Sequence, residues 1–261
     1  MDLKLDGKNA VVCGSTQGIG KAAANELALL GADITLIARD EKKLKAVVKD
    51  LPTPLGQKHD YLVADFNNPE SLQSGLEKHF SRETFHILIN NTGGPPPGTA
   101  FDAKSDEYIK AFTNHLLCNQ VLVQALVPGM KKSQYGRIIN IISTSVKVPI
   151  RGLGVSNTIR GAVANWAKTL SLELGPFGIT VNNVLPGTAM TARLEALIKN
   201  RAKKAGKTVE EIRRDMIAEI PAGRIADASE VAAAIAFLAS PAAGYINGIN
   251  LPVDGGRTGS L

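Results

Sequence analysis

Cysteine and long apolar runs are both scarce in this sequence of 261 residues. The two cysteines, Cys13 and Cys118, lie far apart and match no spacing of metal ligands, so neither a disulfide framework nor a metal site is expected. No apolar run is long enough to span a bilayer, and the first residues lack the charged and apolar regions of a secretory signal. We therefore predict a cytoplasmic protein with no membrane partner and no bound metal.

Aromatic residues are also few, at 5%, which bears on how the positive charge is interpreted. The formal net charge is +6, and its densest source is KNRAKKAGK at 199–207. This segment has no interleaved aromatic residues and matches no nucleic-acid-binding module, so we predict no nucleic-acid partner. A solvated helix face is one interpretation of the segment, and contact with an anionic substrate is the other.

Strand-like and helix-like segments alternate along the whole chain. Apolar runs rich in β-branched residues predict strands at 9–13, 34–38, 61–64, 85–90, 137–142, 179–184 and 249–253. Helical patterns lie between them at 19–30, 69–80, 106–131, 153–174 and 228–239. This order predicts an α/β fold: one doubly wound, mostly seven-stranded parallel sheet with helices on both faces.

Two irregular stretches follow predicted strands, TGGPPPG at 92–98 and the longer segment 188–220. Both would emerge at the carboxyl ends of strands, where open α/β sheets bind ligands. The prolines stiffen the first stretch, which is either a wall of a binding pocket or a rigid surface connection. We expect the functional site between these two stretches.

The run CGSTQGIG at 13–20 follows the first predicted strand directly. Its glycines permit a tight turn and close approach of the backbone to a pyrophosphate, and the next helix would aim its amino terminus at negative charge. A simple strand-to-helix turn is the alternative. The residues expected at the nucleotide are Gly14, Ser15, Gln17, Gly18, Ile19 and Gly20.

The glycine spacing, with three residues between the first two, resembles that of the short-chain dehydrogenase/reductase family. The likeness continues in Asn90-Asn91-Thr92-Gly93, in GRIINIIS at 136–143, in Pro186-Gly187-Thr188 with Thr191, and in GRIADASEVAAAIAFLAS and NGINLPVDGG near the C-terminus. It is closest to the β-ketoacyl carrier-protein reductase-like branch and covers essentially the whole chain. It implies cofactor contacts from Asp65, Asn91, Gly93, Pro186, Gly187 and Thr188.

The same resemblance implies one NAD(P)-binding Rossmann-type domain over residues 1–261, with a substrate lid at 188–220. It also implies a small-molecule substrate and a homo-oligomer, often a tetramer. Since the basic segment falls in the lid region, a phosphate- or carboxylate-bearing substrate is conceivable.

The end of the second strand bears on the choice of nucleotide. There Ala38 is followed by Arg39, where NAD-preferring proteins usually carry an acid that hydrogen-bonds the ribose hydroxyls. Because arginine binds a 2′-phosphate, NADP(H) is favoured over NAD(H). A surface arginine at the start of the next helix is the alternative, since Arg-Asp-Glu also suits a helix start.

The catalytic positions of the family are only partly matched. In the family a serine and a tyrosine contact the substrate carbonyl or hydroxyl, a lysine holds the nicotinamide ribose and lowers the tyrosine pKa, and an asparagine anchors a proton relay. Counted from Gly136, these positions fall on Ser143, Ser156, Arg160 and His115, respectively. Serine is a poorer acid than tyrosine, whose pKa is about 10, and arginine keeps the charge but cannot relay a proton.

Two hypotheses follow from this substitution. The first is an NAD(P)(H)-dependent oxidoreductase acting on an unknown carbonyl or alcohol, with the proton supplied by His115 or by a water held by Ser143 and Ser156. The second is a catalytically inactive NAD(P)-binding protein that senses the cofactor or joins an assembly. A Ser143–His115 hydrolase is not supported, because no orienting group or oxyanion hole is identifiable.

Overall fold

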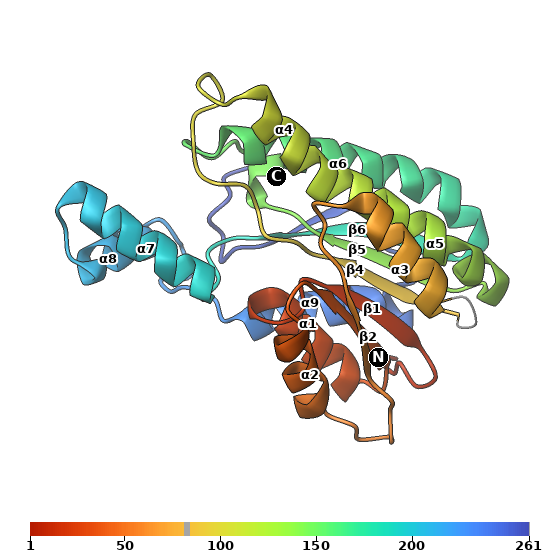
Figure 1. Cartoon of the computed structure of the whole chain (residues 1–261). Coiled ribbons are helices and arrows are strands. Elements are labelled where there is room, and N and C mark those ends of the chain that lie inside the picture. Colours follow the sequence, from red (N-terminus) through yellow and green to blue (C-terminus); the bar gives the residue numbers. More distant parts are fainter. Residues whose placement is uncertain (81–83, 261) are drawn as a thin grey trace.

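Parallel strands form one central sheet in the computed structural model, which describes residues 1–80 and 84–260 (Figure 1). Within these residues seven strands pair in the order β3-β2-β1-β4-β5-β6-β7. They are β1 (Asn9–Cys13), β2 (Asp33–Ala38), β3 (Asp60–Val63), β4 (Ile87–Asn90), β5 (Gly136–Ile141), β6 (Ile179–Pro186) and β7 (Asn250–Val253). The predicted fold class is confirmed, and each predicted strand end lies within two residues of its observed position.

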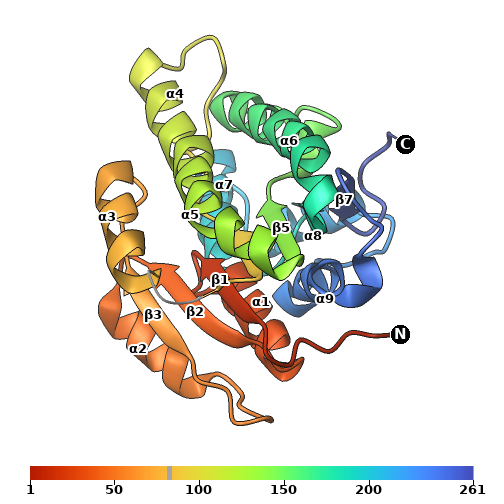
Figure 2. The same cartoon turned by 90° about the vertical axis from the view of Figure 1, so that its right-hand side faces the viewer.

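Helices cover both faces of the sheet (Figures 1 and 2). One face carries α1 (Gly18–Leu29), α2 (Glu41–Asp50) and α9 (Ala228–Ala239), and the other carries α3 (Pro69–Phe80), α5 (Cys118–Ser133) and α6 (Gly154–Leu174). Successive strand residues alternate between the two cores: Ala10 and Val12 pack with the first set of helices, and Val11 and Cys13 with the second. Both faces are therefore apolar, as a buried parallel sheet requires.

The predicted helix at 106–131 is continuous but not uniform. It consists of α4 (Ser105–Phe112), a π-helical segment (Thr113–Leu117) and α5. A π-helical turn inserts one extra residue and rotates the side chains that follow it, and such turns are frequent at functional sites. The segment contains His115, whose side-chain direction could not be read from regular helical spacing.

The segment 188–220 is a correction, because most of it is helical rather than irregular. It contains α7 (Ala192–Ala205) and α8 (Val209–Ala218), which extend away from the sheet as an arm (Figure 1). Ile198 and Ala202 of α7 pack against Ile212 of α8 in a small core of their own. Thr208 and Glu211 form a capping box that starts α8. None of the helices in the described part of the chain has the length and apolar character needed to cross a membrane.

Four asparagines form a ladder across neighbouring strands near the carboxyl ends of the sheet. Asn90, Asn140, Asn183 and Asn250 lie opposite one another in the register of β4, β5, β6 and β7. The side-chain amide of each donates to the side-chain oxygen of the next, over 2.8, 2.9 and 2.8 Å. Within the described residues Asn90 Oδ1 has no partner, but the other amide groups at the three junctions are paired, and the ladder ties together the strands beneath the cleft described below.

Candidate functional site

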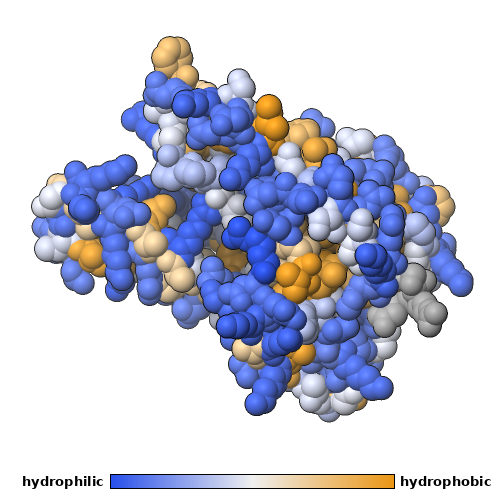
Figure 3. Space-filling model, viewed as in Figure 1, coloured by the Kyte–Doolittle hydropathy of each residue, from blue (hydrophilic) through white to orange (hydrophobic). Residues whose placement is uncertain are grey.

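A cleft of about 1280 Å³ lies at the carboxyl ends of the strands. It opens where β1 and β4 are neighbours and the strand order reverses, which is where open α/β sheets bind ligands. Figure 3 shows mainly hydrophilic side chains around the hollow between the arm and the body of the molecule. Pockets for one small ligand usually measure about 300–1,000 Å³, so this cleft has room for a dinucleotide and a second molecule.

The glycine loop forms one end of the cleft. Gly14 and Gly18 have positive φ angles of 58° and 56°, and both line the cleft. A Cβ on Gly20 would lie 2.3 Å from the Gly14 carbonyl oxygen, so no larger residue fits there. The side chain of Gln17, the N-cap residue of α1, makes no capping hydrogen bond, and the first backbone N–H groups of this helix suit an anion. These features fit a bound pyrophosphate.

Not every residue predicted in this loop faces the cleft. Gln17 and Ile19 line it together with Gly14 and Gly18, whereas Ser15 is fully buried and its hydroxyl donates to the Ile37 carbonyl at 3.4 Å. Gly20 packs behind the loop. Ser15 and Gly20 thus shape the loop, and the other predicted residues face the space that a nucleotide would fill.

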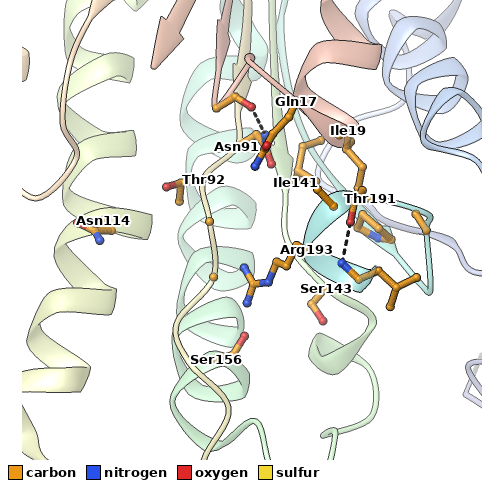
Figure 4. A pocket seen from close by; sticks show the side chains of 18 of the residues that line it. Gln17, Ile19, Asn91, Thr92, Asn114, Ile141, Ser143, Ser156, Thr191 and Arg193 are labelled. Atoms are coloured by element: carbon orange, nitrogen blue, oxygen red, sulfur yellow. Dashed lines mark hydrogen bonds between the residues drawn. The ribbon is translucent and has the colours of Figure 1, made fainter. Parts of the chain in front are cut away.

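Asn91 holds the loop from the neighbouring strand end. Its side-chain amide donates to the carbonyl oxygens of Cys13 and Gly14, at 3.3 and 3.2 Å. Figure 4 shows Asn91 beside Gln17 of the loop. Gly93 follows in the same wall of the cleft. Pro186, Gly187 and Thr188 line the opposite wall, after β6. The structure therefore brings these five predicted residues to one cleft.

Charged residues line the end of the cleft that lies next to β2. Arg39, the first residue after β2, is exposed and lines the cleft with Lys42 and Lys43. The ammonium group of Lys43 lies 3.7 Å from the Asp40 carboxylate. Asp65 also lines the cleft, and its carboxylate accepts hydrogen bonds from Asn67.

Ser143, Ser156 and Arg160 reach the other end of the same cleft. Ser143 follows β5, and its hydroxyl oxygen accepts a hydrogen bond from the Ser145 backbone N–H at 3.1 Å. Arg160 of α6 is only 8% exposed, and its Nη1 donates to the Ile141 carbonyl at 2.7 Å. Burial, and secondly the charge of Arg193, lowers the pKa of Arg160 to about 10. An arginine with this pKa remains protonated near neutral pH.

Arg193 is a cleft residue that the sequence analysis did not identify. It lies at the start of α7, and its guanidinium group points toward the segment after β4 (Figure 4). There Nη2 donates to the Pro95 carbonyl at 3.3 Å. A Cβ on Gly94 would lie 3.0 Å from Arg193 Nη1 and 3.4 Å from Arg160 Nη2. Two guanidinium groups therefore converge at Gly94. The only signal in the sequence was the place of Arg193, two residues after Thr191.

The structure does not bring His115 to this cleft. His115 is 3% exposed and lines a separate small cavity with Asn90, Asn119 and Arg160. Burial, followed by the charges of Arg160 and Arg193, lowers its pKa to about 2, although a hydrogen bond to the Gly93 backbone acts in the opposite direction. The ring is therefore neutral near pH 7 and stands behind the wall. Its neighbour Asn114 lines the cleft instead.

The proline-rich stretch at 92–98 and the basic segment at 199–207 each line the cleft only in part. Thr92, Gly93 and Gly94 line the cleft, while Gly98 is hydrogen-bonded to Gly152 and Gly154 beside α6, so the proline-rich stretch is a wall at one end and an anchor at the other. Within the basic segment, Arg201 lines the cleft, and Lys207 pairs with Asp215 at 2.7 Å.

Comparison with known proteins adds relatives along the whole chain. Residues 14–258 match the family described as enoyl-(acyl carrier protein) reductase. The 3-oxoacyl-(acyl-carrier-protein) reductase FabG of Haemophilus influenzae is 35% identical over 97% of this chain and 98% of its own length. L-Sorbose reductase from Gluconobacter frateurii, solved with NADPH and L-sorbose, is 30% identical, with a TM-score of 0.93 over 100% of both chains. YwfH, an NADPH-dependent reductase involved in bacilysin biosynthesis, is 29% identical, with a TM-score of 0.91 over 97% of this chain and 99% of that one.

Proposed function

Because this chain belongs to the short-chain dehydrogenase/reductase family, we propose that it is an NADP(H)-dependent oxidoreductase acting on a small carbonyl compound or the matching alcohol. One observation carries the proposal: a single cleft joins the glycine loop to Ser143, Ser156 and Arg160. When bound, the nicotinamide cofactor supplies or accepts the hydride, and the protein orients the partners and handles one proton.

In this proposal the cofactor lies along the cleft from Arg39 to Arg160. The pyrophosphate binds at Gly14, Gly18 and the amino terminus of α1, where backbone N–H groups face negative charge. Asp65 would hold the adenine, the segments 91–93 and 186–188 would hold the nicotinamide, and Arg160 would donate a hydrogen bond to its ribose.

A preference for NADP(H) rests on the charge at the end of β2. Arg39 and Lys42 line the cleft there, and the preceding residue is Ala38 instead of an acid. Two cations favour a 2′-phosphate, whereas the ribose hydroxyls of NAD(H) would gain no acidic acceptor at this position. NADPH-bound relatives such as L-sorbose reductase support the same choice.

The proton is handled by hydroxyl groups rather than by a phenol. Since the Ser143 oxygen accepts the Ser145 N–H, its own proton is free to be donated to a substrate oxygen. Ser156 lines the same space, and a water between the two hydroxyls would replace the lost proton from solvent. Arg160 stays charged and stabilises negative charge that develops on the substrate oxygen.

A second candidate is an NAD(P)-binding protein without turnover. The residue at position 156 favours it, because a serine hydroxyl is shorter and less acidic than a tyrosine phenol. The two candidates differ in one respect: both bind NADPH, and only the enzyme oxidises it when a carbonyl compound is added.

The proposal is tested by calorimetric titration with NADPH and NADH. We expect tighter binding of NADPH, and Arg39→Ala should weaken it about tenfold to hundredfold, since a charge-assisted hydrogen bond contributes about 1.5–3 kcal/mol. Lys49→Ala is the matched control, because Lys49 is exposed on α2 and does not line the cleft. NADPH oxidation is then followed with a panel of ketones. Absence of binding to either nucleotide would refute the proposal, and binding without any turnover would favour the second candidate.

We also propose that the protein is a homo-oligomer. Large apolar side chains are exposed along the helices of one face, including Ile109 of α4 (67%) and Leu172 of α6 (71%). Burying such side chains against a second copy would stabilise an assembly. Light scattering on a sizing column measures the mass directly, and a monomer at micromolar concentration would contradict this part of the proposal.

A further inference from the structure

The corner of the cleft beside Gly94 carries two positive charges that come from different elements. Arg160 projects from α6, and Arg193 from the start of α7. Arg193 Nη1 and Nη2 and Arg160 Nη2 all lie within 3.4 Å of the position that a Cβ on Gly94 would take. Glycine at position 94 therefore leaves room for the two guanidinium groups to meet.

Neither arginine is neutralised by the described part of the chain. Across residues 1–80 and 84–260, no aspartate or glutamate forms an ion pair with Arg160 or Arg193, although five pairs of a lysine or arginine with a carboxylate occur elsewhere. Arg160 is more than nine-tenths buried. A buried cation without a counter-ion is costly, and the cost rises when a second cation lies beside it. An anion bound between the two would remove this cost.

We propose that Arg160 and Arg193 together bind a carboxylate group of the substrate, which makes the substrate a keto acid or the corresponding hydroxy acid. This inference rests on the proposed oxidoreductase function and adds to it the class of molecule reduced. The carboxylate lies at Gly94, and the reacting carbonyl lies toward Ser143 and Ser156, which surround the same space as Arg193 (Figure 4).

The hydrogen bonds already made by the two arginines fit this role. Arg160 uses Nη1 on the Ile141 carbonyl, and Arg193 uses Nη2 on the Pro95 carbonyl. These bonds fix the orientation of both groups, and within residues 1–80 and 84–260 Arg160 Nη2 and Arg193 Nη1 make no hydrogen bond. Each of these nitrogens carries two N–H groups, so Arg160 Nη2 can donate to a carboxylate as well as to the cofactor ribose. A carboxylate has two oxygens and can accept one hydrogen bond from each guanidinium group.

The position of Arg193 favours substrate over cofactor phosphate. The turn before α7 packs on the glycine loop through Thr191, whose Cγ2 lies 3.1 Å from the position of a Cβ on Gly18. Arg193 continues from there, away from the loop, and ends beside Gly94 and Arg160. The pyrophosphate site at the amino terminus of α1 and the guanidinium pair are thus at separate places along the cleft.

The test is calorimetric titration of the full-length protein, both unloaded and saturated with NADP⁺, with levulinate, its methyl ester and inorganic phosphate. Levulinate carries a ketone and a carboxylate, the ester lacks the charge, and phosphate is an anion without the ketone. Arg193→Gln removes one guanidinium group from an exposed residue, and Lys204→Gln on α7 is the control with the same change of charge outside the cleft. Gly94→Ala keeps the net charge but places a methyl group 3.0 Å from Arg193 Nη1.

We expect levulinate to bind and its methyl ester to bind at least tenfold more weakly. Arg193→Gln and Gly94→Ala should each weaken levulinate at least tenfold, while Lys204→Gln has no effect and the Kd for NADPH is unchanged by Arg193→Gln. Equal binding of acid and ester, no binding of levulinate, or Arg193-dependent binding of phosphate alone would overturn the inference.

Two further outcomes separate this inference from the proposed function. If Arg193→Gln weakens NADPH as much as levulinate, then Arg193 is a cofactor contact and the inference fails while the function stands. If the wild-type protein binds no nucleotide, the proposed function fails, and the titration of unloaded protein still decides whether the arginine pair binds a carboxylate.

Discussion

Replacing Asn140 by alanine should lower the free energy of unfolding by about 2–6 kcal/mol. Asn140 is fully buried in the asparagine ladder, where it accepts from Asn90 Nδ2 at 2.8 Å and donates to Asn183 Oδ1 at 2.9 Å. The substitution leaves two buried atoms, Asn90 Nδ2 and Asn183 Oδ1, without the hydrogen bonds they make to Asn140, and each such atom costs about 1–3 kcal/mol. The loss of stability thus arises from unpaired atoms on β4 and β6, whereas the substituted residue lies on β5.

The measurement is urea denaturation followed by tryptophan fluorescence. Trp166 is the only tryptophan in the chain and packs against the core on α6, so its signal reports loss of tertiary structure. Protein concentration is held fixed, because association would add to the apparent stability. The variant should show a lower midpoint with the same dependence on urea, since the surface exposed on unfolding hardly changes.

Thr180→Val supplies the matched control in the same sheet. The Thr180 hydroxyl is buried and has no hydrogen-bond partner within the described residues, so removing it should leave stability unchanged or raise it by about 1–3 kcal/mol. The reasoning is refuted if Asn140→Ala costs less than about 1 kcal/mol, or if Thr180→Val destabilises the protein as much as Asn140→Ala does.

Two other predictions concern protons. The pKa of His115 is about 2 in the folded protein and about 6.5 when unfolded, so below about pH 6.5 the unfolded chain binds a proton that the folded protein does not, and stability falls as the pH drops. By about pH 4.5 this lowers the free energy of unfolding by about 2–3 kcal/mol relative to about pH 6.5. His115→Gln should lack that loss when urea unfolding is measured at these two pH values. An identical pH dependence of stability in variant and wild type would contradict the low pKa of His115. Under the proposed function, kcat/KM for reduction should show no ionisation of an active-site group between about pH 6 and 9, because the pKa of Arg160 is about 10 and that of His115 is about 2. An apparent pKa in that range that does not belong to the substrate would mean that another group supplies the proton.

The sheet could be predicted from the sequence because its signal is repeated in every strand. Runs such as those of β1 and β5 are apolar on both faces, which in a soluble chain is typical of a parallel sheet covered by helices. The helices of the arm were not predicted, because their apolar pattern is weak. Charged residues dominate α7, and the apolar stripe of Leu194, Ile198 and Ala202 is narrow. The Thr208–Glu211 capping pattern was the available signal for α8.

The site could be predicted only as far as its constraints are local. The glycine loop is determined by neighbouring residues, and it could be predicted from the spacing of its glycines alone. The meeting of Arg160 with Arg193 depends on how α7 leaves the sheet, which no short pattern encodes. For His115, counting from Gly136 gave a position but not a direction, and the π-helical segment places the ring behind the cleft wall.

The arm formed by α7 and α8 has its own small core, separate from the two cores that flank the sheet. Substitutions on its cleft side, such as at Arg193 or Arg201, therefore change the surface presented to a substrate without disturbing the packing that keeps the sheet folded. Under the proposed function, such a segment would acquire new substrate preferences while the part of the chain proposed to bind the nucleotide stays the same. Diversity of substrates on one cofactor-binding framework then requires changes in a short stretch of chain and not in the whole fold.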